Sequence, residues 1–168
     1  MYALAERPRE LSPEEALPCG SGKSTILVLP ELIDPENLGS AFRNAAALGC
    51  DALLLGPKGP DPLSRRVLRV SMGASLSLPW ARLSGSENMC LVARRGYEAA
   101  ACVLDPDAED LRTWSRPQRL ALVLGNEAFG LSVSWLAACT YRLTLPMCGG
   151  TDSLNLATAA AIFLYNFL

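Results

Sequence analysis

"LVLGNEAFGLS", residues 122–132, joins an apolar run to a polar loop, with Gly130 shortly before the next helical pattern. Strands buried in parallel sheets are apolar on both faces, and open α/β sheets bind ligands where such strands end. The stretch therefore predicts a central parallel strand that ends at a binding crevice. Taken alone, turn-forming glycines and a helix cap at Ser132 explain the same letters.

On both sides of this stretch, apolar strands alternate with helical patterns, which predicts an α/β fold: a mostly parallel sheet with helices on both faces. The expected strands are 25–30, 52–55, 76–80, 99–104, 119–124 and 141–145, and the expected helices are 37–48, 62–70, 87–95, 132–138 and 153–166. Residues 25–168 are expected to form one domain. Residues 1–24, rich in charge, Pro and Gly, predict a flexible lead-in with one short helix near 13–16, or the remnant of a linker to a missing N-terminal domain.

Two further loops combine polar residues with glycine. In "IDPENLGSAFRNAAALG" (33–49), Asn37 and Gly39 open a helix, and Arg43 lies further along it. Glycine there would let a ligand approach the backbone, and an arginine fork suits phosphate or carboxylate. In "LPMCGGTDSLNLATAAAIFLYN" (145–166), a strand ends at a Gly-Gly loop, and Ser153-Leu154-Asn155 cap an apolar helix. Helix caps explain each loop singly, but three loops at one end of a sheet favour a site.

Composition excludes several classes of function. The chain of 168 residues has a net charge of −2 and lacks histidine, which removes Ser-His-Asp and Cys-His catalysis and most zinc sites. Its six cysteines show no C-x-x-C spacing and are expected to be free thiols in a reducing compartment, with no metal. The apolar C-terminus, 154–168, is shorter than the ~20 residues that a membrane span needs. A cytoplasmic protein that binds no membrane is expected.

The stretch "GSGKST" (20–25) resembles a phosphate-binding loop at first reading. Such a loop needs a glycine where Leu17 stands, and it follows a strand and opens a helix. Here the strand-like run comes after the loop. A P-loop nucleotide-binding protein is therefore the least favoured of the readings.

Three motifs in order, N-x-G-x-x-x-R from Asn37, LGNE-x-x-G-LS from Leu124 and LPM-x-G-x-x-SLN-x-x-x-A-A-x-x-LY from Leu145, resemble the SpoU (TrmH-like) family of RNA ribose 2′-O-methyltransferases in the SPOUT superfamily. The resemblance covers about residues 27–166. It implies a deep C-terminal trefoil knot, a homodimer formed through knot-side helices, and S-adenosylmethionine as cofactor. The implied reaction moves a methyl group to a ribose 2′-hydroxyl of rRNA or tRNA. The alternative is a non-catalytic dimeric RNA-binding module of the same fold.

The resemblance also implies roles for individual residues. The cofactor would be held by Leu124, Gly125, Leu145, Met147 and Leu154, and the residues around the reacting groups would be Arg43, Asn37, Glu127, Ser153 and Asn155. An arginine pKa above ~12 makes a literal base awkward, so Arg43 is expected to anchor phosphate or stabilise developing alkoxide charge. Of the arginine clusters, Arg65, Arg66 and Arg69 are expected to follow the phosphates of the RNA.

Overall fold

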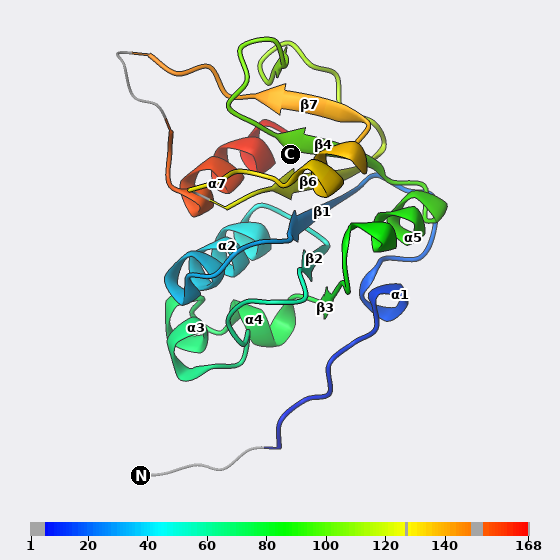
Figure 1. Cartoon of the computed structure of the whole chain (residues 1–168). Helices are drawn as coiled ribbons and strands as arrows, with labels where there is room; N and C mark the ends of the chain where they lie inside the picture. Colours follow the sequence, from blue (N-terminus) through cyan, green and yellow to red (C-terminus); the bar gives the residue numbers. More distant parts are fainter. Residues whose placement is uncertain (1–5, 127, 149–152, 168) are drawn as a thin grey trace.

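The computed structural model describes residues 6–126, 128–148 and 153–167. Its centre is a seven-stranded sheet in the order β3-β2-β1-β6-β4-β7-β5, in which every pairing is parallel (Figure 1). The strands are β1 (Ser24–Leu29), β2 (Ala52–Leu55), β3 (Trp80–Arg82), β4 (Glu98–Cys102), β5 (Glu109–Asp110), β6 (Arg119–Leu124) and β7 (Tyr141–Thr144). The predicted parallel sheet is confirmed.

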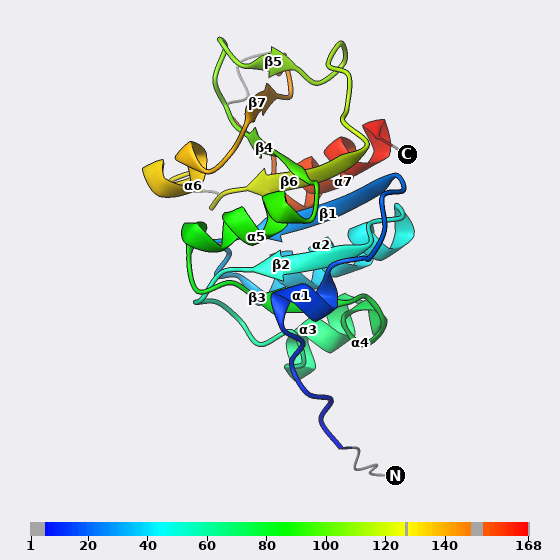
Figure 2. The same cartoon turned by 90° about the vertical axis from the view of Figure 1, so that its right-hand side faces the viewer.

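Helices cover both faces of the sheet, as Figure 2 shows. One face carries α2 (Pro35–Ala47), α3 (Arg65–Val70), α4 (Ala74–Ser77) and α7 (Leu156–Asn166). The other face carries α1 (Pro13–Ala16), α5 (Met89–Arg94), which follows the short 3-10 helix η1 (Ser86–Asn88), and α6 (Val133–Ala137).

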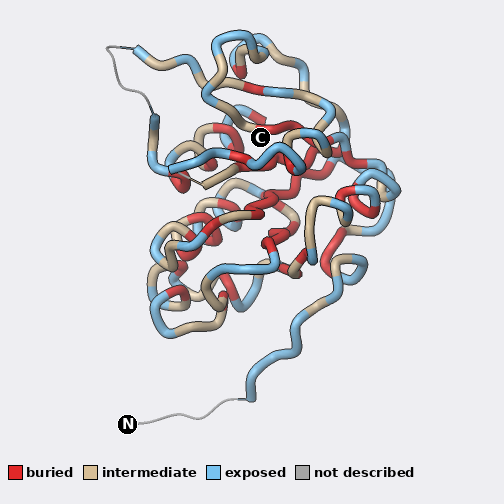
Figure 3. Tube along the Cα trace, viewed as in Figure 1, coloured by how far each residue is buried: buried red, intermediate tan, exposed pale blue. Residues whose placement is uncertain are grey.

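The two central strands explain the two-sided core. Every residue of β1 and β6 is buried, and their side chains alternate between the faces. Leu27 and Leu29 therefore pack under α2 and α7, whereas Ile26 and Val28 pack toward α1 and α5. Figure 3 shows the buried chain concentrated along these strands and the inward sides of the helices.

The strand predicted at 76–80 is wrong over most of its length. Gly73 has a φ of 84°, and α4 follows it, so the strand begins only at Trp80. The alternation of Leu and Ser mimicked a strand, but Leu76 is exposed while the Ser75 hydroxyl is buried against Ser71. Pro79 keeps the preceding residue extended and ends the helix. The two-residue strand β5 was not predicted.

The helix starts predicted at residues 37, 62 and 153 shift to Pro35, Arg65 and Leu156. Asn155, not Ser153, is the N-cap of α7, and its side-chain oxygen accepts hydrogen bonds from the backbone N–H groups of Ala157 (2.9 Å) and Thr158 (3.3 Å). The helix α2 begins at Pro35 behind the N-cap Asp34, so Asn37 lies in its first turn.

Gly39 lies inside α2, where its role differs from the one predicted. A Cβ at Gly39 would lie 2.6 Å from the Cβ of Val70 on α3. The glycine therefore permits close packing of two helices and does not open the backbone to a ligand.

The segment expected to be a flexible lead-in lies against the sheet over residues 11–20. The helix α1 forms where it was expected, Leu11 forms a parallel bridge with Ala81 of β3, and Leu17 is buried. Arg119 donates hydrogen bonds to the carbonyl oxygens of Pro18 (2.9 Å) and Gly20 (2.6 Å). The loop therefore turns carbonyl groups toward a buried cation, and β1 follows it directly, which is unlike a phosphate-binding loop.

Candidate active site

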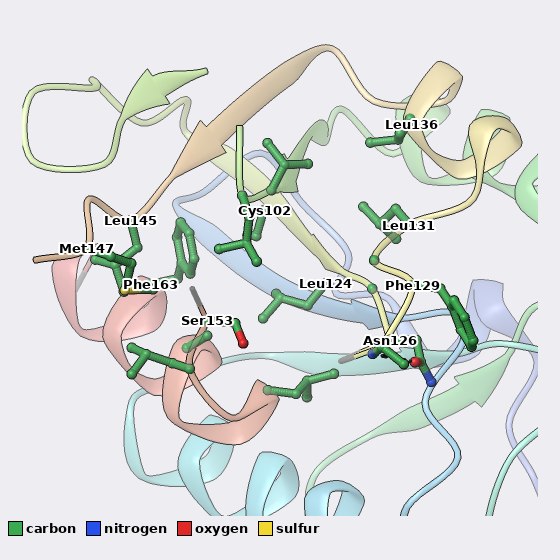
Figure 4. Close-up of a pocket in the computed structure, with 18 residues that line it drawn as sticks. Cys102, Leu124, Asn126, Phe129, Leu131, Leu136, Leu145, Met147, Ser153 and Phe163 are labelled. Atoms are coloured by element: carbon green, nitrogen blue, oxygen red, sulfur yellow. Dashed lines mark hydrogen bonds between the residues drawn. The ribbon is translucent and has the colours of Figure 1, made fainter. Parts of the chain in front are cut away.

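A pocket of about 360 Å³ opens at the carboxyl ends of β4, β6 and β7 (Figure 4). Its walls are mostly apolar side chains, and its polar groups come from the loop after β6 and from the residues before α7. Pockets of this size, apolar with few polar groups, are typical of small-molecule sites. The lining residues are Cys102, Val103, Leu104, Leu124, Gly125, Asn126, Ala128, Phe129, Gly130, Leu131, Leu136, Leu145, Met147, Ser153, Leu154, Leu156, Ala159 and Phe163.

The loop after β6 folds back on itself at the mouth of this pocket. Asn126 and Gly130 exchange backbone hydrogen bonds of 2.9 and 2.8 Å, and the Asn126 side-chain oxygen accepts from the N–H of Ala128. A Cβ on Gly125 would lie 2.2 Å from the carbonyl carbon of Gly130, so only glycine fits there. Gly130 takes a φ of 67°, which also favours glycine. The glycines of this motif thus shape the edge of the pocket.

All five residues predicted to hold the cofactor line this one pocket. Leu124 and Gly125 come from the end of β6, Leu145 and Met147 follow β7, and Leu154 precedes α7. Parallel strands bring these distant segments to the same edge of the sheet, as the sequence predicted. Whether they bind a cofactor stays a prediction.

The described residues predicted to surround the reacting groups do not all lie in the pocket. Ser153 lines the pocket. Asn155 donates a 2.7 Å hydrogen bond to the side-chain oxygen of Asn37, which joins the N-terminal ends of α7 and α2. Glu127 lies outside the described residues.

Arg43 is exposed on α2, one residue before Asn44, whose amide donates to the carbonyl of Ala157 (2.8 Å) and fixes α2 against α7. Arg43 does not line the pocket. It faces solvent beside the α2–α7 pair, and its predicted role is untested by this geometry.

The three arginines predicted to bind RNA all lie exposed on α3, and Arg66 forms an ion pair with Glu36 of α2. Arg116, which precedes β6, has a structural role. Arg116 donates to the backbone carbonyls of Ser24 (2.9 Å), Phe167 (3.0 Å) and Gln118 (3.0 Å). It therefore ties the amino ends of the central strands to the end of α7.

The cysteines are free thiols. Burial raises the pKa of Cys50 to about 12 and that of Cys139 to about 11. In the described part of the chain, no three His, Cys, Asp or Glu side chains gather as a metal site. No helix there is long and apolar enough to cross a bilayer.

Sequence reasoning missed part of the pocket wall. Leu104 and Leu136 line it from segments that carry no motif, and only the folded sheet brings them together. Leu131 belongs to the LGNE-x-x-G-LS motif, but it was not assigned to the site. Phe129 was also missed, although it stands inside the quoted glycine-rich loop at a position where the motif allows any residue. The signal that could have identified Phe129 as a site residue was the presence of a large aromatic side chain in a tight polar turn.

The SpoU rRNA Methylase family model matches residues 24–165. Among curated relatives, an uncharacterised tRNA/rRNA methyltransferase of Mycobacterium bovis is 41% identical over 170 residues, which cover 98% of this chain and 58% of the relative.

Two solved structures superimpose closely on the chain. One, an AdoMet-bound rRNA methyltransferase from Sinorhizobium meliloti, is 30% identical with a TM-score of 0.86, and the match covers 94% of this chain and 60% of that one. The other, an RNA 2′-O ribose methyltransferase, is 31% identical with a TM-score of 0.78, over 97% and 58% of the two chains. The chain thus spans about 60% of the length of each of these three proteins.

Proposed function

The chain belongs to the SpoU rRNA Methylase family, and from that membership we propose that it transfers a methyl group from S-adenosylmethionine to a ribose 2′-hydroxyl of rRNA or tRNA. The observation that carries the proposal is the convergence of two of the three family motifs on one pocket, through Leu124 and Gly125 of one and Leu145, Met147 and Leu154 of the other. The solved structures named for AdoMet binding and for 2′-O ribose methylation support the cofactor and the position of the methyl group.

The pocket fits S-adenosylmethionine in size and chemistry. Leu124, Leu131 and Phe163 offer apolar surfaces for a purine ring, and the tight Gly125–Gly130 turn brings backbone N–H and C=O groups to the rim. A pocket without charged side chains among its described lining residues suits recognition by shape and backbone. When bound, the cofactor supplies an electrophilic methyl group on a sulfonium.

The acceptor hydroxyl has to be positioned and relieved of its proton. We assign positioning to Ser153, which lines the pocket, and to the Asn37–Asn155 pair beside it. Arg43 donates hydrogen bonds and has no acceptor atom, so we do not assign it to take that proton. Its proposed role is to hold a phosphate of the RNA or to stabilise charge that develops on the 2′-oxygen. Glu127 keeps its proposed place among these groups.

RNA and a second copy of the chain are the proposed partners, and the cytoplasm is the proposed location. The outer side of α7 leaves Tyr165 exposed beside the half-buried Ala161 and Ile162, an apolar stripe that suits the proposed dimer contact. The proposed trefoil knot would lie at the carboxyl ends of the strands, where the pocket opens. Arg65, Arg66 and Arg69 are proposed to contact phosphates, since each is exposed on α3.

The test is transfer of labelled methyl from S-adenosylmethionine to total rRNA and tRNA, followed by digestion and identification of 2′-O-methylated nucleosides. Arg43→Ala should abolish transfer and leave calorimetric binding of S-adenosylmethionine nearly unchanged. Arg94→Ala, an exposed arginine on α5, is the matched control and should be active. Methylation of bases instead of ribose would refute the assignment, and RNA binding without transfer would favour the non-catalytic module.

A further inference from the structure

Phe129 projects from the lip of the pocket with 90% of its surface exposed (Figure 4). A phenylalanine normally contributes its large apolar area to a core or an interface. This one leaves that area in water directly beside the pocket described above.

The loop that carries Phe129 holds it in place. The paired backbone hydrogen bonds between Asn126 and Gly130 close the turn, and the Asn126 amide donates to the carbonyl of Glu31 (3.2 Å). The carboxylate of Glu31 accepts from the N–H of Ser132 (3.2 Å) just beyond the turn. Hydrogen bonds therefore fix the turn that carries the ring, so a ligand that stacks on Phe129 loses little binding free energy to ordering of the loop.

We propose that Phe129 is a stacking platform for an unpaired RNA base at, or next to, the nucleotide whose ribose is methylated. This inference rests on the proposed function. A ribose whose 2′-oxygen reaches a methyl donor in the pocket brings its own base or a neighbouring one to the pocket lip, where Phe129 stands. Proteins commonly hold splayed RNA bases by stacking them on aromatic rings.

The residues at the pocket lip are better suited to stacking on a base than to hydrogen bonding with the edge of a base. The Asn126 side chain is engaged by Ala128 and Glu31, so its amide is already used to brace the turn. Leu104 is also an exposed apolar residue of the pocket lining, but it has no aromatic face on which a base could stack. Val133 is exposed as well, but it starts α6 and does not line the pocket. Since every base has a ring face, contact through Phe129 tolerates different bases. Phe129 is thus a positioning residue that contributes affinity and orientation.

The experiment measures binding of fluorescently labelled single-stranded RNA and methyl transfer to total rRNA and tRNA. Stacking on one aromatic ring predicts that Phe129→Ala weakens RNA binding by roughly fivefold to a hundredfold. Phe129→Tyr and Phe129→Trp should bind like the wild type, whereas Phe129→Leu should resemble Phe129→Ala. Val133→Ala, which removes exposed apolar surface outside the pocket, is the matched control and should bind normally. Thermal stability should be unchanged, because the ring is exposed.

Three results would overturn the proposal. Full RNA binding by Phe129→Leu would show that apolar contact suffices without an aromatic ring. A parallel loss of S-adenosylmethionine affinity in Phe129→Ala would show that the ring covers the cofactor. Dissociation of a dimer in sedimentation of Phe129→Ala would show that it packs against a second copy. Absence of methyl transfer by the wild type counts only against the proposed function. The role of Phe129 is tested by comparing the RNA affinities of the variants, which does not require methyl transfer.

Discussion

Asn155 joins two roles that one pair of substitutions can separate. Its side-chain oxygen caps α7 through the N–H groups of Ala157 and Thr158, and its amide donates to Asn37. Loss of an N-cap costs about 1 kcal/mol, and loss of an exposed hydrogen bond costs about 0.5–1 kcal/mol. Asn155→Ala should therefore lower the free energy of unfolding by about 2 kcal/mol. For a domain of this size, that lowers Tm by about 4–8 °C.

Asn155→Asp keeps the capping oxygen and loses only the amide donor. A carboxylate at a helix N-terminus contributes about 0.3–1 kcal/mol, which offsets most of the lost contact with Asn37. We expect a Tm within about 2 °C of the wild type. Because the proposed site uses the amide, Asn155→Asp should nevertheless lose most methyl transfer.

Calorimetry or circular dichroism measures Tm, and labelled methyl transfer measures activity in the same preparations. Equal destabilisation by the two variants would refute the assignment of stability to the cap. Full transfer by Asn155→Asp would refute a role for the amide in the reaction.

Three further predictions concern packing, pH and salt. Gly39→Ala gains about 1 kcal/mol of helix propensity, but its Cβ would lie 2.6 Å from the Cβ of Val70. Such overpacking costs about 1–3 kcal/mol, so urea unfolding should show a net loss of stability. Burial raises the pKa of the Cys50 thiol from 9.0 to about 12, so above pH 9 the unfolded chain loses this proton while the folded chain keeps it. The free energy of unfolding therefore falls by about 1.4 kcal/mol per pH unit above pH 9. Cys50→Ala should flatten that slope in denaturation measured from about pH 8 to 11. Replacing Arg65, Arg66 and Arg69 by Ala should weaken RNA binding and make its salt dependence shallower, while S-adenosylmethionine affinity, measured by calorimetry, stays unchanged.

The positions of glycine and proline in the loops predicted local structure, because these residues mark places where the backbone conformation or the available space is restricted. Gly125 was assigned to the edge of a ligand site, and it does line the pocket, where no Cβ fits beside Gly130. Gly39 looked equivalent in the sequence and turned out to serve contact between α2 and α3. A glycine signals that a side chain would clash but does not identify what it would clash with.

The resemblance to the SpoU family chose the individual residues Leu124, Gly125, Leu145, Met147 and Leu154. What the residue patterns determined by themselves was the alternation of buried strands and helices, and with it the meeting of the loops that follow the strands at one edge of the sheet. Those features follow from hydrophobic periodicity and from the rule that parallel strands end on the same side.

The tertiary structure alone decided the rest, because it depends on contacts between segments far apart in the chain. It placed β6 between β1 and β4, paired Asn37 with Asn155, and buried Arg119 against the carbonyls of residues 18 and 20. It also left Phe129 in solvent at the lip of the pocket, where its apolar ring has no protein core to join.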